Sequence, residues 1–220
     1  MPPAAPIRLV VGLGNPGLRY RNTRHNLGFM VLDRLAEREN WAWTTEKRWK
    51  AEVTKSPDGS LWMIKPQTFM NLSGEAVAPM ARYMRLEPAA VLAVVDDLEL
   101  PWERLRLRAS GSAGGHNGLR SMIQQLGTDQ FPRLRIGVGR PTDSRDPVDH
   151  VLGKFTLDEQ AGLANLLDRA IVAILAAHRQ GLEVAMNAFN QDPGAPARTP
   201  KAGGPPQASP ASPKDIPSST

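Results

Sequence analysis

The chain alternates short apolar runs with segments whose apolar residues recur at helical spacing. Between the apolar runs, residues three and four apart share one helix face after Asn26, after Ser73 and after Gly118, which predicts three helices. Five other segments predict strands, because each is short, apolar or alternating, and bounded by turn-forming or charged residues. These strands are Ile7–Leu13, Leu61–Ile64, Val91–Val95, Leu105–Arg108 and Arg133–Val138. The order of elements predicts one α/β domain.

Capping residues predict where helices begin. Thr156-Leu157-Asp158-Glu159 has the form of a capping box, so a long helical stretch is expected after it, interrupted near Gly181 and ending about Phe189. Asn71 or Ser73 is expected to cap the helix that follows the second strand.

The last thirty residues differ from the rest. Residues 191–220 hold eight of the twenty prolines, no aromatic residue and one large aliphatic residue, Ile216. Such a composition cannot fill a core. We therefore expect a folded domain over 1–190 and a proline-rich, disordered tail over 191–220.

Composition narrows the classes of protein. The 220 residues include no cysteine, which excludes disulfides, a thiolate zinc site and a cysteine nucleophile. No apolar stretch approaches the roughly 20 residues of a membrane span, and the start lacks a secretory signal. We expect a cytoplasmic protein without a membrane segment. The formal net charge of +5 is compatible with a nucleic-acid partner, and most of it belongs to the folded body.

Polar side chains with unusual chemistry gather in loops that follow the predicted strands. Such loops meet at the carboxyl edge of an open α/β sheet, where ligands bind. The residues are Asn15, His25, Asn26, Asn71, Asp96, His116 and Asn117.

Two of the four histidines are candidates for catalysis. His178 lies between helical apolar runs, which favours a surface role, and His150 precedes a loop-like segment. His25 and His116 lie in the polar loops, where imidazole can accept a proton at neutral pH and Asp96 can fix its tautomer. The alternative is that Asp96 caps a turn and His25 caps a helix.

Other kinds of site are disfavoured. Gly12, Gly14 and Gly17 match G-x-G-x-x-G, but Pro16 removes one N–H and no helix follows at once, so nucleotide binding and oxidoreductase chemistry are disfavoured. Zinc would need four scattered ligands, because no H-x-x-x-H pair exists. No G-x-S-x-G elbow indicates a serine nucleophile.

Arginines concentrate in one part of the chain. Between Pro101 and Arg140 there are seven arginines, no lysine and two acidic residues. On strands, Arg106 and Arg108 share a face, as do Arg133 and Arg135, and guanidinium forks suit phosphate oxygens. A solvated charged face and a phosphate-binding surface are both compatible with this pattern.

Four motifs in order resemble the bacterial-type peptidyl-tRNA hydrolases over roughly residues 7 to 189. The motifs are Val11-Gly12-Leu13-Gly14-Asn15-Pro16-Gly17 with Tyr20 and Thr23-Arg24-His25-Asn26, then Thr68-Phe69-Met70-Asn71-Leu72-Ser73-Gly74, Asp96-Asp97-Leu98-Glu99-Leu100-Pro101 and Gly114-Gly115-His116-Asn117-Gly118-Leu119. The resemblance implies a monomeric α/β globule with a mixed, mostly parallel twisted sheet flanked by helices. It also implies an esterase that frees tRNA from prematurely released peptides, with no metal and no organic cofactor.

The resemblance also implies roles for individual residues. His25 matches the catalytic base and Asp96 the carboxylate that orients it. Arg135 matches a strand arginine that contacts tRNA phosphate, while Arg108 stands where some relatives have lysine. The positions implied to line the substrate site are Asn15, Tyr20, Met70, Asn71, His116 and Asn117.

These roles give a mechanistic hypothesis and one rival. His25 would take a proton from the water that attacks the ester joining the peptide to the terminal ribose of tRNA. The asparagine amides would hold water, oxyanion and peptide backbone without adding charge. The rival is a noncatalytic RNA-binding protein of the same fold, which would have no need of a base with its orienting carboxylate.

Overall fold

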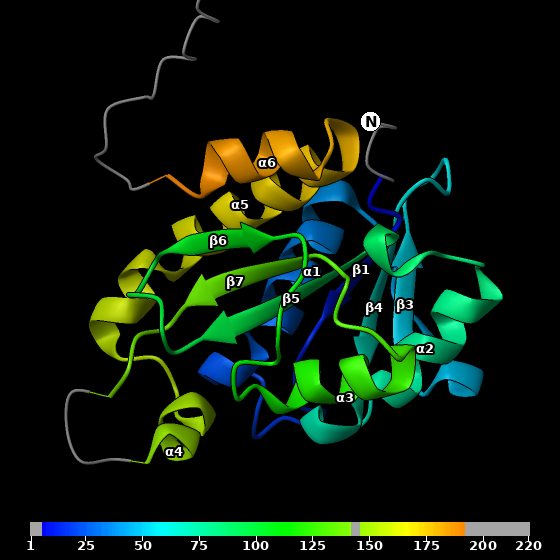
Figure 1. Cartoon of the computed structure of the whole chain (residues 1–220). Coiled ribbons are helices and arrows are strands. Elements are labelled where there is room, and N and C mark those ends of the chain that lie inside the picture. Colours follow the sequence, from blue (N-terminus) through cyan, green and yellow to red (C-terminus); the bar gives the residue numbers. More distant parts are fainter. Residues whose placement is uncertain (1–5, 142–145, 192–220) are drawn as a thin grey trace, which may run out of the picture.

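One seven-stranded sheet forms the centre of the computed structural model, which describes residues 6–141 and 146–191 (Figure 1). The strand order is β2-β3-β4-β1-β5-β7-β6. The strands are β1 (Leu9–Gly12), β2 (Thr44–Glu46), β3 (Ala51–Lys55), β4 (Trp62–Pro66), β5 (Val91–Asp97), β6 (Leu105–Arg108) and β7 (Arg133–Gly137).

Parallel pairing is confined to the four central strands. β1 pairs in parallel with β4 and β5, and β5 pairs in parallel with β7. The margins are antiparallel, with β2 and β3 beyond β4 and with β6 beyond β7. The predicted α/β domain with a mixed sheet is confirmed.

Helices cover the sheet on both faces. One face carries α1, α5 and α6, while α2 and α3 pack on the other. In Figure 1, α4 lies apart from these helices, at the lower left. The helices are α1 (Leu27–Glu39), α2 (Ser73–Tyr83), α3 (Asn117–Leu126), α4 (Pro147–Leu152), α5 (Leu157–Arg179) and α6 (Leu182–Phe189); the short 3₁₀ helices are η1 (Arg24–Asn26), η2 (Lys47–Trp49), η3 (Met70–Leu72) and η4 (Pro88–Ala90).

Alternate residues of β1 and of β5 enter two separate cores. Along β5, Leu92 and Val94 pack beneath α1, α5 and α6, whereas Ala93 and Val95 face α2 and α3. Because both faces are buried, these strands read as unbroken apolar runs in the sequence.

Two glycines let α1 approach β1 closely. A Cβ atom on Gly12 would lie 2.5 Å from the carbonyl oxygen of Gly28, and one on Gly28 would lie 2.4 Å from the nitrogen of Leu13. The close contact brings η1, which precedes α1, over the carboxyl end of the sheet. Gly12 therefore allows the strand and the helix to pack closely, and this is its physical role in the segment that contains Gly12, Gly14 and Gly17.

The caps of two helices differ in how well the sequence predicted them. The capping box of α5 is present, because Thr156 and Glu159 each accept from the other's backbone N–H. The predicted cap of α2 is wrong. Ser73 is already the first residue of α2 and its hydroxyl donates to the carbonyl of Met70 at 2.8 Å, while Asn71 belongs to η3 and does not cap α2.

Helix α5 has the length and composition of a membrane-spanning helix, although the sequence led us to expect none. In this fold one side of α5 is buried and contacts α1, α6 and β7. Leu166, Ile171 and Ile174 on that side are fully buried. Core helices of globular domains pass the same test, and 39% of the apolar window of α5 is buried. The predicted disordered tail lies, apart from Gln191, outside the described residues.

Candidate active site

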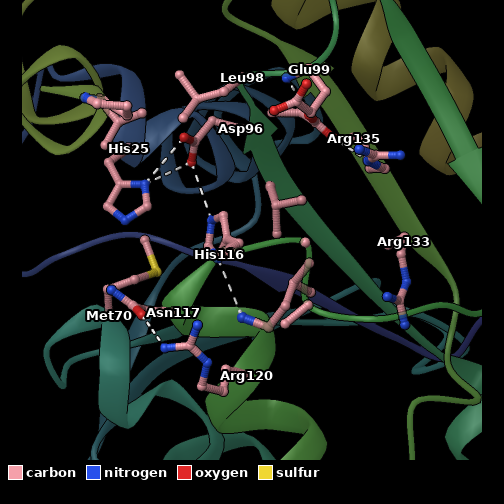
Figure 2. Close-up of a pocket in the computed structure, with 18 of the residues that line it drawn as sticks. His25, Met70, Asp96, Leu98, Glu99, His116, Asn117, Arg120, Arg133 and Arg135 are labelled. Carbon is pink, nitrogen blue, oxygen red and sulfur yellow. Dashed lines mark hydrogen bonds and ion pairs between the residues drawn. The ribbon is translucent and has the colours of Figure 1, made fainter. Parts of the chain in front are cut away.

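A cavity of about 970 Å³ opens at the carboxyl end of the central strands. Its wall combines the loops after β1 and β5, η3, the glycine-rich loop before α3, the β6–β7 face and α4. Figure 2 shows His25, Asp96 and His116 together on one side of the cavity, with Arg133 and Arg135 farther along. All ten site residues predicted from the sequence line this cavity: His25, Asp96, Asn15, Tyr20, Met70, Asn71, His116, Asn117, Arg108 and Arg135.

His25 and Asp96 are in direct contact. Nδ1 of His25 lies 2.9 Å from Oδ1 and 3.2 Å from Oδ2 of Asp96, and the side chains are 12% and 3% exposed. A carboxylate is an acceptor, so Nδ1 carries the hydrogen and Nε2 is left without one in the neutral ring. This tautomer leaves Nε2 free to accept a proton.

Burial and charge oppose each other in this pair. Burial alone would lower the pKa of His25, but the charge and hydrogen bond of Asp96 outweigh it, and the pKa is raised above 6.5. Burial would likewise raise the pKa of Asp96, yet His25 and His116 hold it well below the usual range. Asp96 is therefore ionised at neutral pH.

His116 links Asp96 to helix α3. Its Nδ1 accepts from the backbone N–H groups of Gly118 at 3.1 Å and Leu119 at 3.3 Å, which caps α3. Since Nδ1 is an acceptor, Nε2 carries the hydrogen and donates it to Oδ1 of Asp96 at 3.3 Å. The sequence analysis gave His116 as a candidate for catalysis and as a residue that lines the substrate site, and it did not predict the capping role.

Asn15 is held so that one end of its amide is occupied. Its Oδ1 accepts from the backbone N–H of Met70 at 2.8 Å. The side chain of Asn26 bonds both backbone groups of Asn15, with distances of 2.8 and 2.9 Å. Because Oδ1 is engaged, the NH₂ group of Asn15 is available to the cavity.

The other predicted lining residues have looser environments. Asn71 is exposed within η3, whereas Met70 is buried beside Gly118. Oδ1 of Asn117 accepts from Arg120 at 2.9 Å, so its NH₂ group is the end of the amide that can donate to a ligand. Tyr20 carries the guanidinium of Arg19 over its ring at 4.4 Å.

Four arginines share one face of β6 and β7. The register pairs Arg106 with Arg135 and Arg108 with Arg133, so like charges lie directly opposite one another. Such pairs are unfavourable unless anions compensate them. Within the described residues, Nε of Arg135 donates to Oδ2 of Asp97, so Asp97 supplies a negative charge that compensates the arginines on this face.

Arg133 was not predicted as a site residue, yet it shapes the cavity wall. Its buried guanidinium donates to the carbonyl groups of Gly111, Ser112 at 3.0 Å, Asp129 at 2.9 Å and Phe131. Burial lowers the pKa of Arg133. These bonds fix the start of the glycine-rich loop. The alternation of arginines in the sequence predicts a charged face of the strand, but it does not predict that the side chain of Arg133 is buried.

The remaining histidines lie outside the contact between His25 and Asp96. His150 is buried within α4, where Nε2 lies 3.3 Å from the carbonyl of Val138, so the loop expected around it is wrong. His178 lies on α5, with Nδ1 2.7 Å from the carbonyl of Ile7, which is a structural role.

The cluster of His25, Asp96 and His116 also has the donor set of a metal site. One ligand atom each from His25, Asp96 and His116 lies within 4.8 Å of the others. Both imidazoles already donate to Asp96, so an ion would have to replace two hydrogen bonds. The cluster is thus complete as a hydrogen-bonded unit.

The chemistry that this arrangement offers is activation of water by an oriented imidazole, beside a surface that suits phosphate groups. Fold and site together are those of an α/β protein with an oriented imidazole beside a positively charged face at the carboxyl edge of its sheet.

Comparison with known proteins gives the family. The family model for peptidyl-tRNA hydrolase matches residues 9–197. The chain is 51% identical over 191 residues to a peptidyl-tRNA hydrolase of Synechococcus sp. (strain JA-3-3Ab), covering 86% of this chain and 85% of that protein. It is 47% identical over 188 residues to that of Chloroflexus aurantiacus (strain ATCC 29366 / DSM 635 / J-10-fl), covering 83% and 98%.

A solved structure agrees with these relatives. The crystal structure of peptidyl-tRNA hydrolase from Acinetobacter baumannii has a TM-score of 0.78 and 33% identity, covering 84% of this chain and 94% of that one. The chain belongs to the peptidyl-tRNA hydrolase family. It is an enzyme that hydrolyses peptidyl-tRNA, and the noncatalytic RNA-binding alternative is not favoured.

Proposed function

We propose that His25 is the general base of this hydrolase and that Asp96 orients it. Nε2 of His25 takes a proton from water, and the water oxygen attacks the carbonyl carbon of the ester between peptide and terminal ribose. The resulting oxyanion collapses, the bond to the ribose oxygen breaks, and the imidazolium returns its proton to that oxygen. A positioned base is worth about 10²- to 10⁴-fold in rate.

Two asparagine amides are suited to the oxyanion. Because Oδ1 of Asn15 bonds Met70 and Oδ1 of Asn117 bonds Arg120, each NH₂ group can donate into the cavity. A well-aimed donor contributes about 3 kcal/mol to transition-state stability. Asn71, Tyr20 and Met70 line the same cavity and contact the peptide or the terminal nucleotide in this proposal.

His116 acts in this proposal through Asp96 and not on the substrate. Its two nitrogens are both engaged, one with the start of α3 and one with Asp96. It therefore joins the carboxylate to the helix that carries Asn117. The base and one oxyanion donor are thereby held in a fixed relation.

Arg108 and Arg135 bind phosphate groups of the tRNA in this proposal. Both line the cavity, and the cross-strand arginine pairs leave an excess of positive charge there. Arg135 is bonded to Asp97, so a phosphate shares or replaces that carboxylate. Fork-shaped guanidinium groups bind phosphate in bidentate geometry.

The contact between Nδ1 of His25 and Asp96 is the observation that carries the proposal. Its test is His25→Ala, with His178→Ala on α5 as the matched control. We expect His25→Ala to abolish cleavage of an N-blocked aminoacyl-tRNA while tRNA binding stays within a few-fold. Turnover retained at about a tenth or more of the control rate would remove His25 from this role.

We further propose that the enzyme acts as a cytoplasmic monomer without a resident metal or organic cofactor. The family resemblance supports this proposal. Light scattering of the purified protein gives its mass in solution. A mass of two or more chains would contradict the monomer.

A further inference from the structure

Arg24, the residue before the proposed base, is 3% exposed although it carries a permanent charge. A buried guanidinium is stable only when its donors are satisfied. Its side-chain partners come from a segment more than 120 residues away in the sequence, between His150 and Glu159, with separations of 126 to 135 residues. The catalytic proposal gives no role to these partners of Arg24.

The partners of Arg24 form a continuous segment from α4 into α5. Nε donates to Glu159 at 3.0 Å and Nη2 donates to the other carboxylate oxygen. Nη1 donates to the carbonyl of His150 at 3.1 Å and to that of Lys154 at 2.9 Å. The backbone N–H of Arg24 donates to the carbonyl of Gly153 at 3.2 Å.

Neighbouring contacts strengthen this connection. Thr23 forms an isolated antiparallel bridge with Lys154, and the ring of Phe155 lies 5.6 Å from the guanidinium. Space around the guanidinium is tight, because a Cβ atom on Gly153 would lie 3.3 Å from Nη1. Glu159 also belongs to the capping box of α5. One carboxylate therefore serves both the helix start and the ion pair.

The segment held by Arg24 carries one wall of the catalytic cavity. Val148, Val151 and Leu152 of α4 all line the cavity. α4 packs against η1, the element that contains Arg24 and His25. The contacts of Arg24 with its partners therefore set the position of this apolar wall relative to His25.

We propose that Arg24 and Glu159 are positioning residues that fix the α4 wall of the cavity against η1, and so set how the substrate end is held beside the base. Neither residue touches the reacting atoms. Bidentate geometry matters, because a lysine retains the charge but not the fork. The inference rests on the hydrolase activity but not on the identity of the base.

Two conservative variants test the proposal. Arg24→Lys keeps the charge, and Glu159→Gln keeps the capping box, because glutamine also serves at that position. Matched controls are Arg34→Lys and Asp168→Asn, which alter a bidentate pair between α1 and α5 with both distances 2.7 Å, outside the cavity lining.

We expect Arg24→Lys and Glu159→Gln each to raise the KM for an N-blocked aminoacyl-tRNA about tenfold, with kcat within about threefold. The KM of the double variant should exceed that of either single variant by no more than about twofold, because both substitutions disrupt the same ion pair. Hydrogen exchange should accelerate in a peptide covering α4 but not in one covering α3. The two controls should change none of these quantities.

Two results would overturn the proposal. A lowered melting temperature with unchanged KM and unchanged exchange in α4 would mean that the pair serves stability alone. A fall in kcat with unchanged KM would mean that Arg24 acts on the base and not on the wall. Full activity in His25→Ala would overturn the proposed base, whereas it would leave the positioning of α4 by Arg24 standing.

Discussion

Replacing Asp96 by asparagine changes almost no volume and removes one charge. In the structure Asp96 accepts hydrogens from Nδ1 of His25 and from Nε2 of His116. Nδ1 of His25 lies within 3.2 Å of both carboxylate oxygens. An asparagine replaces one of these oxygens by an NH₂ group, so in either orientation of the amide a donor faces the N–H of His25. The ring of His25 is then stabilised in the wrong tautomer, with its hydrogen on the nitrogen that faces the cavity.

The size of the effect follows from these two losses. The tautomer and the stabilised imidazolium together are what a positioned base contributes, so kcat should fall by about 10²- to 10⁴-fold. That corresponds to about 3–5 kcal/mol in activation free energy. The pKa of His25 should also fall, because burial lowers it and the opposing charge of Asp96 is gone.

The assay is kcat/KM for an N-blocked aminoacyl-tRNA, measured at pH values on both sides of 6.5, the ordinary pKa of histidine. In the unaltered enzyme, activity should rise as pH increases through a pKa above 6.5, since only neutral His25 accepts a proton. In Asp96→Asn, the pH at which the residual activity rises should be lower than in the unaltered enzyme, because the pKa of His25 falls. Asp168→Asn, an exposed carboxylate on α5, is the control. An unmoved acid limb, or a rate above about a tenth of the original, would refute the reasoning.

Two further predictions concern residues beside this pair. Arg135→Ala should raise KM and make the dependence of log KM on log salt shallower by about 0.9 for each phosphate group that is no longer neutralised, with little change in kcat. An unchanged slope, equal to that of the exposed control Arg38→Ala, would contradict phosphate binding. His116→Asn should keep α3 capped, because asparagine is a good N-cap, but its side chain is too short to reach Asp96. Asp96 then interacts more strongly with His25, so the acid limb of kcat/KM should move to higher pH, and a shift to lower pH would disprove the positioning role.

The central fold could be predicted from the sequence because its strands are buried on both faces. Such strands read as apolar runs, and β1 and β5 were found on that basis. β2 and β3 were missed because Thr44–Glu46 is exposed or partly exposed and Ala51–Lys55 carries charged residues. α4 was missed because it has six residues, too few to show a helical period.

The candidate site shows a similar division. Residue type and position after the strands made His25 and Asp96 candidates, because the loops after strands meet at one edge of the sheet. The resemblance to the family, and not the spacing, implied the role of each. Contacts that depend on packing could not be predicted. The cap formed by His116 is local, but histidine is not among the usual N-cap residues. The burial of Arg133 and the partners of Arg24 depend on how the chain packs in three dimensions, and no spacing rule connects them.

The end of β5 places two neighbouring carboxylates on opposite sides of the sheet. Asp96 continues the row of Leu92 and Val94, while Asp97 continues that of Ala93 and Val95. One carboxylate serves the imidazole and the other the guanidinium of Arg135. The alternation of side chains along β5 thus separates the carboxylate that bonds the imidazole from the carboxylate that bonds the guanidinium. On the roles proposed above, a deletion of one residue within β5 would exchange the faces of the two acids and impair both ester cleavage and tRNA binding, so this strand should tolerate substitutions far better than changes in length.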